Sequence, residues 1–573
     1  MNKAILFSCI IIFFLFTSCD KDPASPDPDN PEIVSGTVIT ADTLSGVLGI
    51  DNSPYIIRKK VSVPKDSTLI IKPGVKLFFK SSENEEDFNY DNLNVGMLEV
   101  NGYIQAEGKT DSTITFSRAN EKGHWGIIFI QSNDTYKGNS FNYCNFEYGN
   151  KADGIYIEDP RFGMIMTYNS KLYVENSTVQ KSKMDGISCY YSAAYVKDNM
   201  IRDNQDEGIT CYDTSAEITN NLFQDNIENS ILFYNYSEGT IKNNVMIGIG
   251  ESIGIYNRGI SLYKSIATIV NNSISNYNGQ GIYIDNFEYI NYGSPIDIII
   301  SENLITNNFT GINISCRYGI YPIISENTVS NNNSTGIWIS LSDDCKIDIN
   351  ENLIENNGRI GIIAQDISEL TIKDNIISNN SLEGIYCDYC NHVDIISNKI
   401  YMNGNSDNFN YPGLYMYYSE SDVINNLIAF NGIGVGLYAS EMNLINCDIA
   451  NNEVGLFLSN INNNLDIKNS IIHNNILLFE LADYYSGSVD ISYCLVQDSI
   501  LIPEITDMGN NLLAVDPLFF DTINNNYQLS SGSPCIDKGT NAIDSLPELD
   551  LLGNPRIVGS AIDIGAYEYQ DGR

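Results

Sequence analysis

Acidic side chains are the first candidates for chemistry in this sequence. Asp343, Asp344, Asp366 and Asp388 lie in a stretch that is rich in aromatic residues. Carboxylates can serve as acid/base groups or as Ca²⁺ ligands, whereas Asp and Asn are also ordinary turn residues. We therefore regard these four residues as candidate catalytic groups or calcium ligands, with a structural role in turns as the alternative.

Histidine and cysteine offer little further chemistry. None of the three histidines has a neighbouring Ser or Cys suited to nucleophilic catalysis. Cys387 and Cys390 form a lone CxxC, without the βαβ context of a redox site or the second CxxC of a metal site. We expect the cysteines of the repeats to fill the core, and a disulfide between Cys189 and Cys211 stays open.

Length and charge exclude several classes of protein. The chain has 573 residues, with 32 Lys and Arg against 72 Asp and Glu, which gives a net charge of −40. Such a chain repels nucleic acid, so we expect no nucleic-acid partner. The length exceeds one ordinary compact core, so the chain forms several domains or one elongated repeat array.

The first residues have the pattern of a targeting segment. Residues 1–18 combine a Lys, a short apolar run and two small residues, and they are expected to be removed as a signal peptide. The following Cys19 completes a motif, FTSC, that resembles a bacterial lipobox, and the acidic residues after it resemble the export signal of Bacteroidetes surface lipoproteins. The resemblance implies lipidation at Cys19, a tether over 19–35 and a place on the bacterial outer membrane, at the cell surface. A plain secretory signal is the alternative.

An internal repeat dominates the rest of the chain. A small polar residue followed two positions later by an apolar residue recurs every 21 to 33 residues between 144 and 496. The polar column consists of Cys144, Ser177, Asn199, Asn221, Asn244, Asn272, Asn303, Asn327, Asn352, Asn375, Asn398, Asn426, Cys447, Asn469 and Cys494. Eight to ten residues beyond most of these lies a Gly-Ile or Gly-Leu pair, followed by short alternating segments that are typical of strands.

These columns predict an all-β fold, a single parallel β-helix with about 22–24 residues in each coil. Stacked coils place an inward Asn above the next one, where side-chain amides can pass hydrogen bonds along the stack. The sequence resembles the right-handed parallel β-helix repeat family through its N-N-x-I and G-I-x-I motifs. We expect N-terminal coils and a cap over 36–143, the repeats over 144–500, and a segment over 501–573 that closes the last coil.

One outward-facing column carries aromatic rings. Two residues beyond the glycine, the side chain should point to solvent, and this position holds Tyr283, Trp338, Tyr386, Tyr415 and Tyr438. Such rings are suited to the faces of sugars or to a protein partner. A ladder that only stabilises the sheet is the alternative.

Two functions follow from these residues. The first is a lipid-anchored surface protein that binds carbohydrate, or a partner protein, through the aromatic column. The second is a polysaccharide lyase or glycoside hydrolase, possibly dependent on Ca²⁺, since the β-helix fold often hosts such enzymes. The Gly-His-Gly motif of polygalacturonase-like hydrolases is missing from the sequence, and their Arg-x-Lys motif is missing from the repeats over 144–500. Binding is therefore the favoured prediction, and catalysis stays uncertain.

Overall fold

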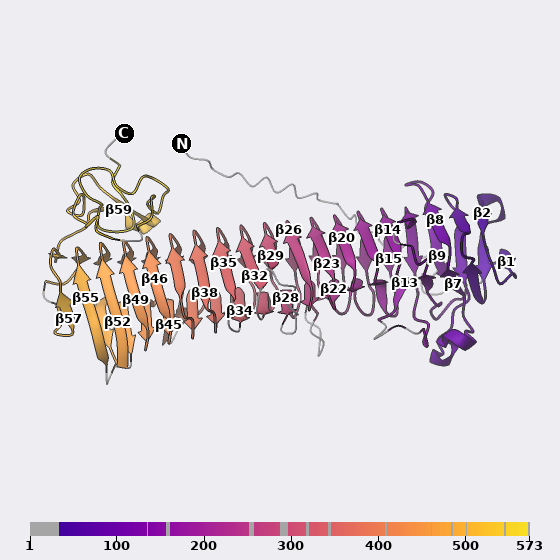
Figure 1. Cartoon of the computed structure of the whole chain (residues 1–573), viewed down its shortest axis with the longest axis horizontal. Helices are drawn as coiled ribbons and strands as arrows, with labels where there is room; N and C mark the ends of the chain where they lie inside the picture. The colour runs from indigo at the N-terminus through magenta and orange to yellow at the C-terminus, as the bar shows by residue number, and fades with distance from the viewer. Residues whose placement is uncertain are drawn as a thin grey trace, which may run out of the picture.

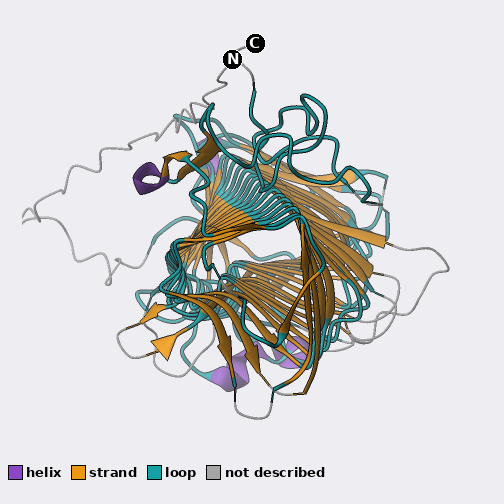
Figure 2. Cartoon of the chain, turned by 90° about the vertical axis from the view of Figure 1, so that its left-hand side faces the viewer, coloured by secondary structure: helices purple, strands orange, loops and turns teal. Residues whose placement is uncertain are grey.

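The computed structural model describes residues 34–570 apart from 135, 156, 158–160, 251–256, 287–295, 317–319, 342–344, 407–408, 460, 483–484, 500 and 544–545. This part of the chain winds into successive coils along one long axis (Figure 1). Each regular coil contributes one strand to each of three parallel sheets, A, B and C, which enclose a common core when viewed along the axis (Figure 2). The prediction of a single right-handed parallel β-helix is confirmed.

The strands of each sheet follow one another in chain order. Sheet A consists of β1 (Thr37–Ile39), β3 (Tyr55–Ile57), β6 (Lys76–Phe79), β9 (Ile114–Arg118), β12 (Cys144–Glu147), β15 (Thr178–Gln180), β18 (Met200–Arg202), β21 (Leu222–Gln224), β24 (Val245–Ile247), β27 (Ser273–Ser275), β30 (Leu304–Thr306), β33 (Thr328–Ser330), β36 (Leu353–Glu355), β39 (Ile376–Ser378), β42 (Lys399–Tyr401), β47 (Leu427–Ala429), β50 (Asp448–Ala450), β53 (Ile471–His473), β56 (Leu495–Val496) and β58 (Leu512–Leu513). Sheet B consists of β4 (Lys60–Val63), β7 (Met97–Val100), β10 (Ile128–Ile130), β13 (Gly163–Tyr168), β16 (Asp185–Tyr190), β19 (Ile209–Tyr212), β22 (Ile231–Tyr234), β25 (Ile260–Tyr263), β28 (Gln280–Asn286), β31 (Thr310–Cys316), β34 (Ile337–Leu341), β37 (Ile362–Gln365), β40 (Ile385–Asp388), β45 (Pro412–Tyr417), β48 (Ile433–Tyr438), β51 (Val454–Ser459) and β54 (Leu477–Leu481). Sheet C consists of β2 (Gly46–Leu48), β5 (Thr68–Ile71), β8 (Tyr103–Glu107), β11 (Gly138–Asn142), β14 (Lys171–Glu175), β17 (Ala193–Lys197), β20 (Ser215–Thr219), β23 (Glu238–Lys242), β26 (Ile266–Val270), β29 (Ile296–Ser301), β32 (Ile320–Ser325), β35 (Lys346–Asn350), β38 (Glu369–Lys373), β41 (Val393–Ile396), β46 (Glu420–Ile424), β49 (Glu441–Ile445), β52 (Ile461–Lys468), β55 (Ser486–Ser492) and β57 (Ile505–Asp507).

A few short elements lie outside these sheets. They are two antiparallel pairs, β43 (Asn405–Ser406) with β44 (Phe409–Asn410) and β59 (Phe519–Asp521) with β60 (Asn526–Leu529), and the 3-10 helices η1 (Ile50–Asn52), η2 (Glu85–Phe88), η3 (Tyr90–Asn92) and η4 (Thr522–Asn524). No α-helix occurs among the described residues, and none of their helices is long and apolar enough to cross a membrane.

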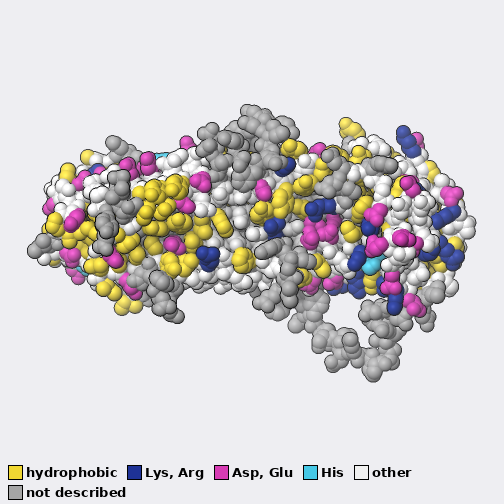
Figure 3. Space-filling view, turned by 90° about the horizontal axis from the view of Figure 1, so that it is seen from below, with side chains coloured by type: hydrophobic (Ala, Val, Ile, Leu, Met, Phe, Trp, Pro, Cys, Tyr) yellow, Lys and Arg dark blue, Asp and Glu magenta, His cyan; other side chains and the backbone are white. Residues whose placement is uncertain are grey.

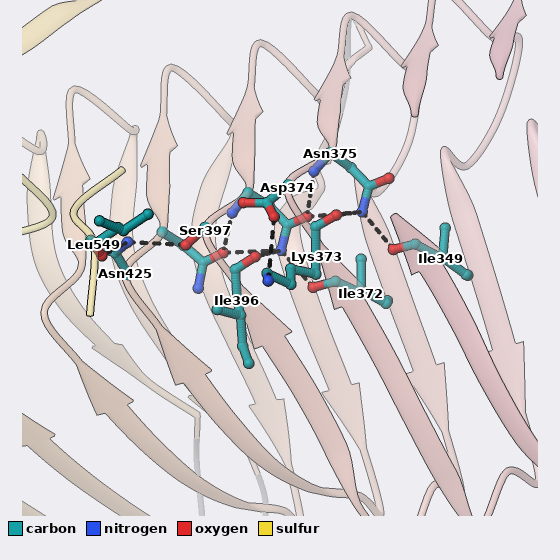
Figure 4. A network of polar contacts seen from close by, with 11 residues as sticks. Ile349, Ile372, Lys373, Asp374, Asn375, Ile396, Ser397, Asn425 and Leu549 are labelled. Carbon is teal, nitrogen blue, oxygen red and sulfur yellow. Dashed lines mark hydrogen bonds and ion pairs between the residues drawn. The ribbon is translucent and has the colours of Figure 1, made fainter. Parts of the chain in front are cut away.

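The predicted asparagine ladder runs inside the corner between sheets C and A. Asn303 Nδ2 lies 2.9 Å from Asn327 Oδ1, and Asn327 Nδ2 lies 3.0 Å from Asn352 Oδ1. Each amide also satisfies a backbone carbonyl: Asn375 Nδ2 donates to Ile349 O at 2.9 Å (Figure 4). Because these asparagines are almost fully buried, the ladder supplies hydrogen bonds that water cannot provide.

A second asparagine ladder, which sequence analysis missed, occupies the corner between sheets A and B. Its members lie five residues beyond those of the first ladder, and Asn332 Nδ2 donates to Asn357 Oδ1 at 3.0 Å. Asn357 in turn donates to Asn380 at 2.9 Å. Asparagines that looked like ordinary turn residues are therefore part of the core.

The predicted columns slip by one or two residues near the C-terminal end. Cys447 N donates to Ser470 Oγ, so Ser470, rather than Asn469, continues the polar column. In sheet B, Gly436 pairs with Tyr415, which makes Gly434 the glycine that precedes the strand core. Both predictions were wrong by a small offset, because a second candidate residue lies within two positions of the one chosen.

The cysteines of the described coils are buried, and none of them forms a disulfide. Cys189 and Cys211 do lie opposite each other in β16 and β19, but they form no disulfide. The prediction that cysteines fill the core agrees with their burial.

The C-terminal segment packs beside the solenoid, not only at its end. Leu427, Ala429 and Ala450 on the outer face of sheet A form one hydrophobic cluster with Tyr527 and Tyr567. Figure 1 shows this segment, with β59, as a separate lobe along the side of the last coils. Its first residues also lie on the end of the solenoid, where β57 and β58 pair with β55 and β56 and Ile505 joins the main core cluster.

Candidate ligand-binding face of sheet B

The outer face of sheet B differs along its length. Figure 3 shows the face that lies along the lower edge of Figure 1, over the strands labelled β22, β28, β34 and β45. Hydrophobic side chains gather over its C-terminal half, at the left of the view, whereas acidic and basic side chains mix over its N-terminal half. The two halves therefore offer different chemistry to a ligand.

The aromatic surface covers the C-terminal half. It consists of Trp338, Tyr386, Tyr389, Tyr415, Tyr417, Tyr418, Tyr438 and Phe457. Tyr386 and Tyr415 stack with ring centroids 5.6 Å apart, because their strands β40 and β45 are paired in register. Trp338 is 39% exposed and Tyr389 is 53% exposed. Of the predicted rings, Trp338, Tyr386 and Tyr415 lie in one column on this surface, whereas Tyr389, Tyr417 and Tyr418 were not predicted.

Tyr438 belongs to a different column from the one predicted. It pairs with Tyr417, and their rings stack with centroids 4.6 Å apart. The position beside Tyr415 is Gly436, where a Cβ would lie 2.7 Å from Tyr415 Cδ2. The missing side chain at Gly436 lets the Tyr415 ring lean over the next coil.

Polar groups with unused hydrogen-bonding capacity lie among these rings. Trp338 Nε1 donates to Gln365 Oε1 at 3.0 Å, and Gln365 Nε2 donates to Asp388 Oδ2 at 3.2 Å. Asp388 Oδ1 and Glu383 Oε2 are buried atoms without a hydrogen-bond partner. Burial raises the pKa of the Glu383 carboxyl. Apolar ring surface beside polar side chains on one face suits a ligand that carries many hydroxyl groups.

Of the predicted catalytic residues, the structure describes Asp366 and Asp388, which lie on adjacent coils in different surroundings. Asp343 and Asp344 lie outside the described residues. Asp366 is exposed in the left-handed turn after β37, with φ 55°, and its backbone N donates to Asp388 O at 2.9 Å. Asp366 thus has the turn conformation that was its alternative, while Asp388 lies among the aromatic rings.

Tyr283 lies in the charged half of the face. The Arg258 guanidinium lies 4.1 Å from the centre of its ring, and Arg258 Nη1 also donates to Tyr263 Oη at 2.6 Å. Burial and Asp285 raise the pKa of the Tyr283 hydroxyl to about 12. This ring is separated in register from Trp338 by Asn313, so the predicted aromatic column is interrupted.

Sequence analysis missed a carboxyl cluster, formed by Asp185, Asp206 and Glu207, at the start of the strands in the charged half. Arg161 Nη1 lies 2.9 Å from Glu207 Oε1, and Asn229 Nδ2 donates to the same oxygen at 3.1 Å. Asp185 Oδ2 and Glu207 Oε2 are buried and have no hydrogen-bond partner. One oxygen from each carboxyl group lies within 4.8 Å of the others.

Burial governs the protonation of this cluster. It raises the pKa of Asp185 to about 8, with a further contribution from Asp206. Burial and the neighbouring carboxylates also raise the pKa values of Asp206 and Glu207. Asp185 and Glu207 are fully buried, whereas Asp206 is half-buried. Asp206 is therefore the member that a ligand can reach, and it keeps its proton near neutral pH.

A second group of possible metal ligands lies on sheet C. His392, Asp394 and Asp422 each place one ligand atom within 4.8 Å of the others, and His392 Nε2 lies 3.6 Å from Asp394 Oδ1. Neither group of three includes Asp366 or Asp388. The predicted calcium ligands thus do not coincide with the metal-ligand groups found among the described residues.

The comparisons with known proteins agree with the fold. The sequence model of a family described as the right-handed beta helix region matches residues 99–246 and 258–408. The chain therefore belongs to the right-handed β-helix family. No curated protein matches it.

Several solved structures are weakly similar to this chain. A periplasmic alginate epimerase, AlgG, is 14% identical, with 68% of this chain and 77% of that chain covered and a TM-score of 0.35. The A-module of mannuronan C-5 epimerase AlgE4 from Azotobacter vinelandii is 10% identical, with 77% and 91% covered and a TM-score of 0.26. Pectate lyase Pel9A is 12% identical, with 64% and 88% covered and a TM-score of 0.30. At these identities and TM-scores the similarity says nothing about activity.

Proposed function

We propose that the protein binds a polysaccharide along the outer face of sheet B, through the aromatic surface. The observation that carries the proposal is the run of stacked, half-buried rings beside the exposed Trp338 and Tyr389, near the carboxyl groups of Glu383 and Asp388. Sugar rings present apolar C–H faces together with hydroxyl donors, so such a surface complements both of their features.

The main test compares two pairs of stacked tyrosines. Tyr386→Ala with Tyr415→Ala removes a stack on the aromatic surface, whereas Tyr173→Ala with Tyr195→Ala removes a stack on sheet C, where the centroids are 4.9 Å apart. Glycan-array and pull-down binding should be lost only in the first variant. Equal glycan binding by both variants would contradict the proposal. If the wild type captures a protein that the Tyr386→Ala with Tyr415→Ala variant does not, the aromatic surface binds a partner protein instead of a glycan.

A second candidate function is catalysis on a polysaccharide, and the carboxyl cluster is the observation that favours it. Asp206 is half-buried with a raised pKa, and Arg161 lies beside Glu207 with a side chain that is 39% exposed. A carboxylic acid that keeps its proton near pH 7 can act as a general acid, and an arginine can hold a substrate carboxylate. These residues are candidate catalytic groups in addition to Asp343, Asp344, Asp366 and Asp388, which stay predictions.

The enzymatic alternative is separable from binding. A polysaccharide panel is assayed for reducing ends and for unsaturated uronate absorbance, with added Ca²⁺ and with a chelator. Catalysis predicts product that Asp206→Asn abolishes while binding to the aromatic surface persists. No product from any polysaccharide, or product that is unchanged in Asp206→Asn, would contradict it.

We also propose that Cys19 carries a lipid that holds the protein on the bacterial outer membrane, at the cell surface. Cys19 lies outside the described residues, and its FTSC motif supports the proposal. Metabolic labelling with a fatty acid should label the wild type and not Cys19→Ala. Protease digestion of intact cells should remove the protein, and full protection would contradict the surface location.

A further inference from the structure

A pocket of ≈ 570 Å³ lies where sheet A turns towards sheet B, in the N-terminal coils. One wall comes from residues that follow successive strands of sheet A: Arg118 ends β9, Tyr148 follows β12 and Lys181 follows β15. The opposite wall is held by an antiparallel bridge in which the backbones of Ser82 and His124 exchange two hydrogen bonds of 2.9 Å. Stacked coils and an inserted loop thus form a pocket that regular coils lack.

The floor of this Arg118 pocket is basic and partly unsatisfied. The Arg118 guanidinium lies 3.8 Å from the centre of the Tyr148 ring, and Lys181 Nζ lies 3.3 Å from Tyr148 Oη. Arg118 Nε and Asn150 Oδ1 are buried atoms without a hydrogen-bond partner, and Asn150 is only 2% exposed. One unused donor and one unused acceptor are therefore available beside a positive charge.

The charges that act on His124 in this pocket are positive on balance. Burial, then Lys183 and Arg118, lower the pKa of His124 to about 4, while Glu85 acts in the opposite direction. His124 is therefore uncharged at neutral pH, and the nearby cations outweigh the nearby carboxylate at this position.

The acidic residues of the pocket lie at its rim and partly have other partners. Glu83, Glu85 and Glu121 are exposed, and Glu85 Oε2 lies 3.1 Å from Lys151 Nζ. The fourth acidic residue, Asp203, is half-buried, and its Oδ2 lies 3.7 Å from Arg202 Nε. Within the described ranges, no ion pair joins Arg118 or Lys183 to a carboxylate. In a chain with a net charge of −40, cations left without carboxylate partners around a pocket call for an anionic ligand.

We infer that the Arg118 pocket is a second binding site, separate from the aromatic surface, for a saccharide that carries a carboxylate or sulfate group. Arg118, Lys181 and Lys183 neutralise the anionic group. Asn150 and Gln205 line the same pocket and can hydrogen-bond to sugar hydroxyl groups. The volume falls within the range of small-molecule sites.

Isothermal titration calorimetry of the full chain tests this inference with three probes: digalacturonic acid, inorganic sulfate and neutral cellobiose. Digalacturonic acid should bind at least about tenfold more tightly than cellobiose, and its affinity should fall as salt rises. Arg118→Gln with Lys183→Gln should weaken that binding at least about tenfold. The control, Lys76→Gln with Lys109→Gln, removes the same charge elsewhere and should change it little.

Several outcomes would overturn the inference. They are equal binding of cellobiose, no binding of digalacturonic acid, or equal weakening by the control variant. Sulfate binding as tight as that of digalacturonic acid would also overturn the saccharide assignment in favour of a free oxyanion. If loss of the Arg118 stack disturbs folding, Lys183→Gln alone, at an exposed residue, should still weaken binding. Tyr386→Ala with Tyr415→Ala should retain digalacturonic acid binding, so this inference and the proposed function fail separately.

Discussion

The two halves of sheet B have the same interior but different exteriors. In the N-terminal half, Tyr190 and Tyr212 are covered by a hydrophobic cluster that includes Phe129 and Phe162, and charged residues gather at its edge. In the C-terminal half, equivalent strands leave Trp338 and Tyr389 exposed. A solenoid can therefore vary its surface from coil to coil while inward asparagines and aliphatic residues preserve the stack.

The largest expected effect tests whether the interior is equivalent in both halves. Asn221→Ala and Asn352→Ala each remove a buried amide that bridges adjacent coils. Each should lower the free energy of unfolding of the surrounding coils by about 3 kcal/mol or more, because several buried groups lose their partners. Hydrogen exchange of neighbouring strands measures this, with exposed Asn443→Ala as the control. Very unequal losses of unfolding free energy in the two halves would contradict the equivalence of the two interiors.

A pH effect should distinguish the charged half. The pKa of Asp185 is raised to about 8 in the folded protein, against about 4 in an unfolded chain. The folded state then binds an extra proton at Asp185. The contribution of Asp185 to the free energy of unfolding is therefore fully present below about pH 4 and declines as pH rises towards 8. The decline is at most about 1.4 kcal/mol per pH unit for each proton.

Local hydrogen exchange in β16 and β19 measures that decline. Asp185→Asn with Glu207→Gln should flatten it, whereas β37 and β40 should change little in the variant. Local exchange is preferred to global unfolding because burial also raises the pKa of Asp448 to about 8. Asp448 would therefore add its own pH dependence to the free energy of global unfolding. An unaltered pH dependence of β16 in the double variant would contradict the assigned protonation.

A binding comparison should sharpen the difference between the exteriors. Trp338→Ala should weaken polysaccharide binding by about thirtyfold, because an exposed indole is a typical hot-spot residue. Tyr283→Ala, in the charged half and stacked with Arg258, should weaken it less than about threefold. Titration calorimetry with the polysaccharide identified by the glycan array measures both. Equal losses would extend the binding site over both halves.

The smallest expected effect concerns aromatic ladders that serve only the sheet. Tyr195→Ala removes a ring that stacks on Tyr173 with an interplanar angle of 19° on sheet C. We expect the free energy of unfolding to fall by about 1 kcal/mol and glycan binding to stay unchanged. Thermal unfolding measures the change in stability, and the glycan array measures binding. Loss of glycan binding in Tyr195→Ala would show that sheet C also contributes to the binding site.

Sequence repetition predicted the fold because in-register parallel strands place equivalent residues above one another. The same logic predicted that Asn303, Asn327 and Asn352 stack and that Trp338, Tyr386 and Tyr415 face outwards.

The charged sites were harder to predict from the sequence. Arg118 and Lys183 are far apart in the chain and meet through stacking and an inserted loop, so they form no spacing motif. Asp185 and Glu207 directly precede the glycines of their coils, a position that sequence analysis did not follow. Their raised pKa values depend on covering segments that periodicity does not reveal.

Hydrogen exchange of the protein with and without bound polysaccharide tests the central claim most directly. We expect bound polysaccharide to slow amide hydrogen exchange over β34, β37, β40 and β45 and to change it little over β16 and β19. Protection confined to the N-terminal coils, or an absence of protection over sheet B despite saturating ligand, would contradict it.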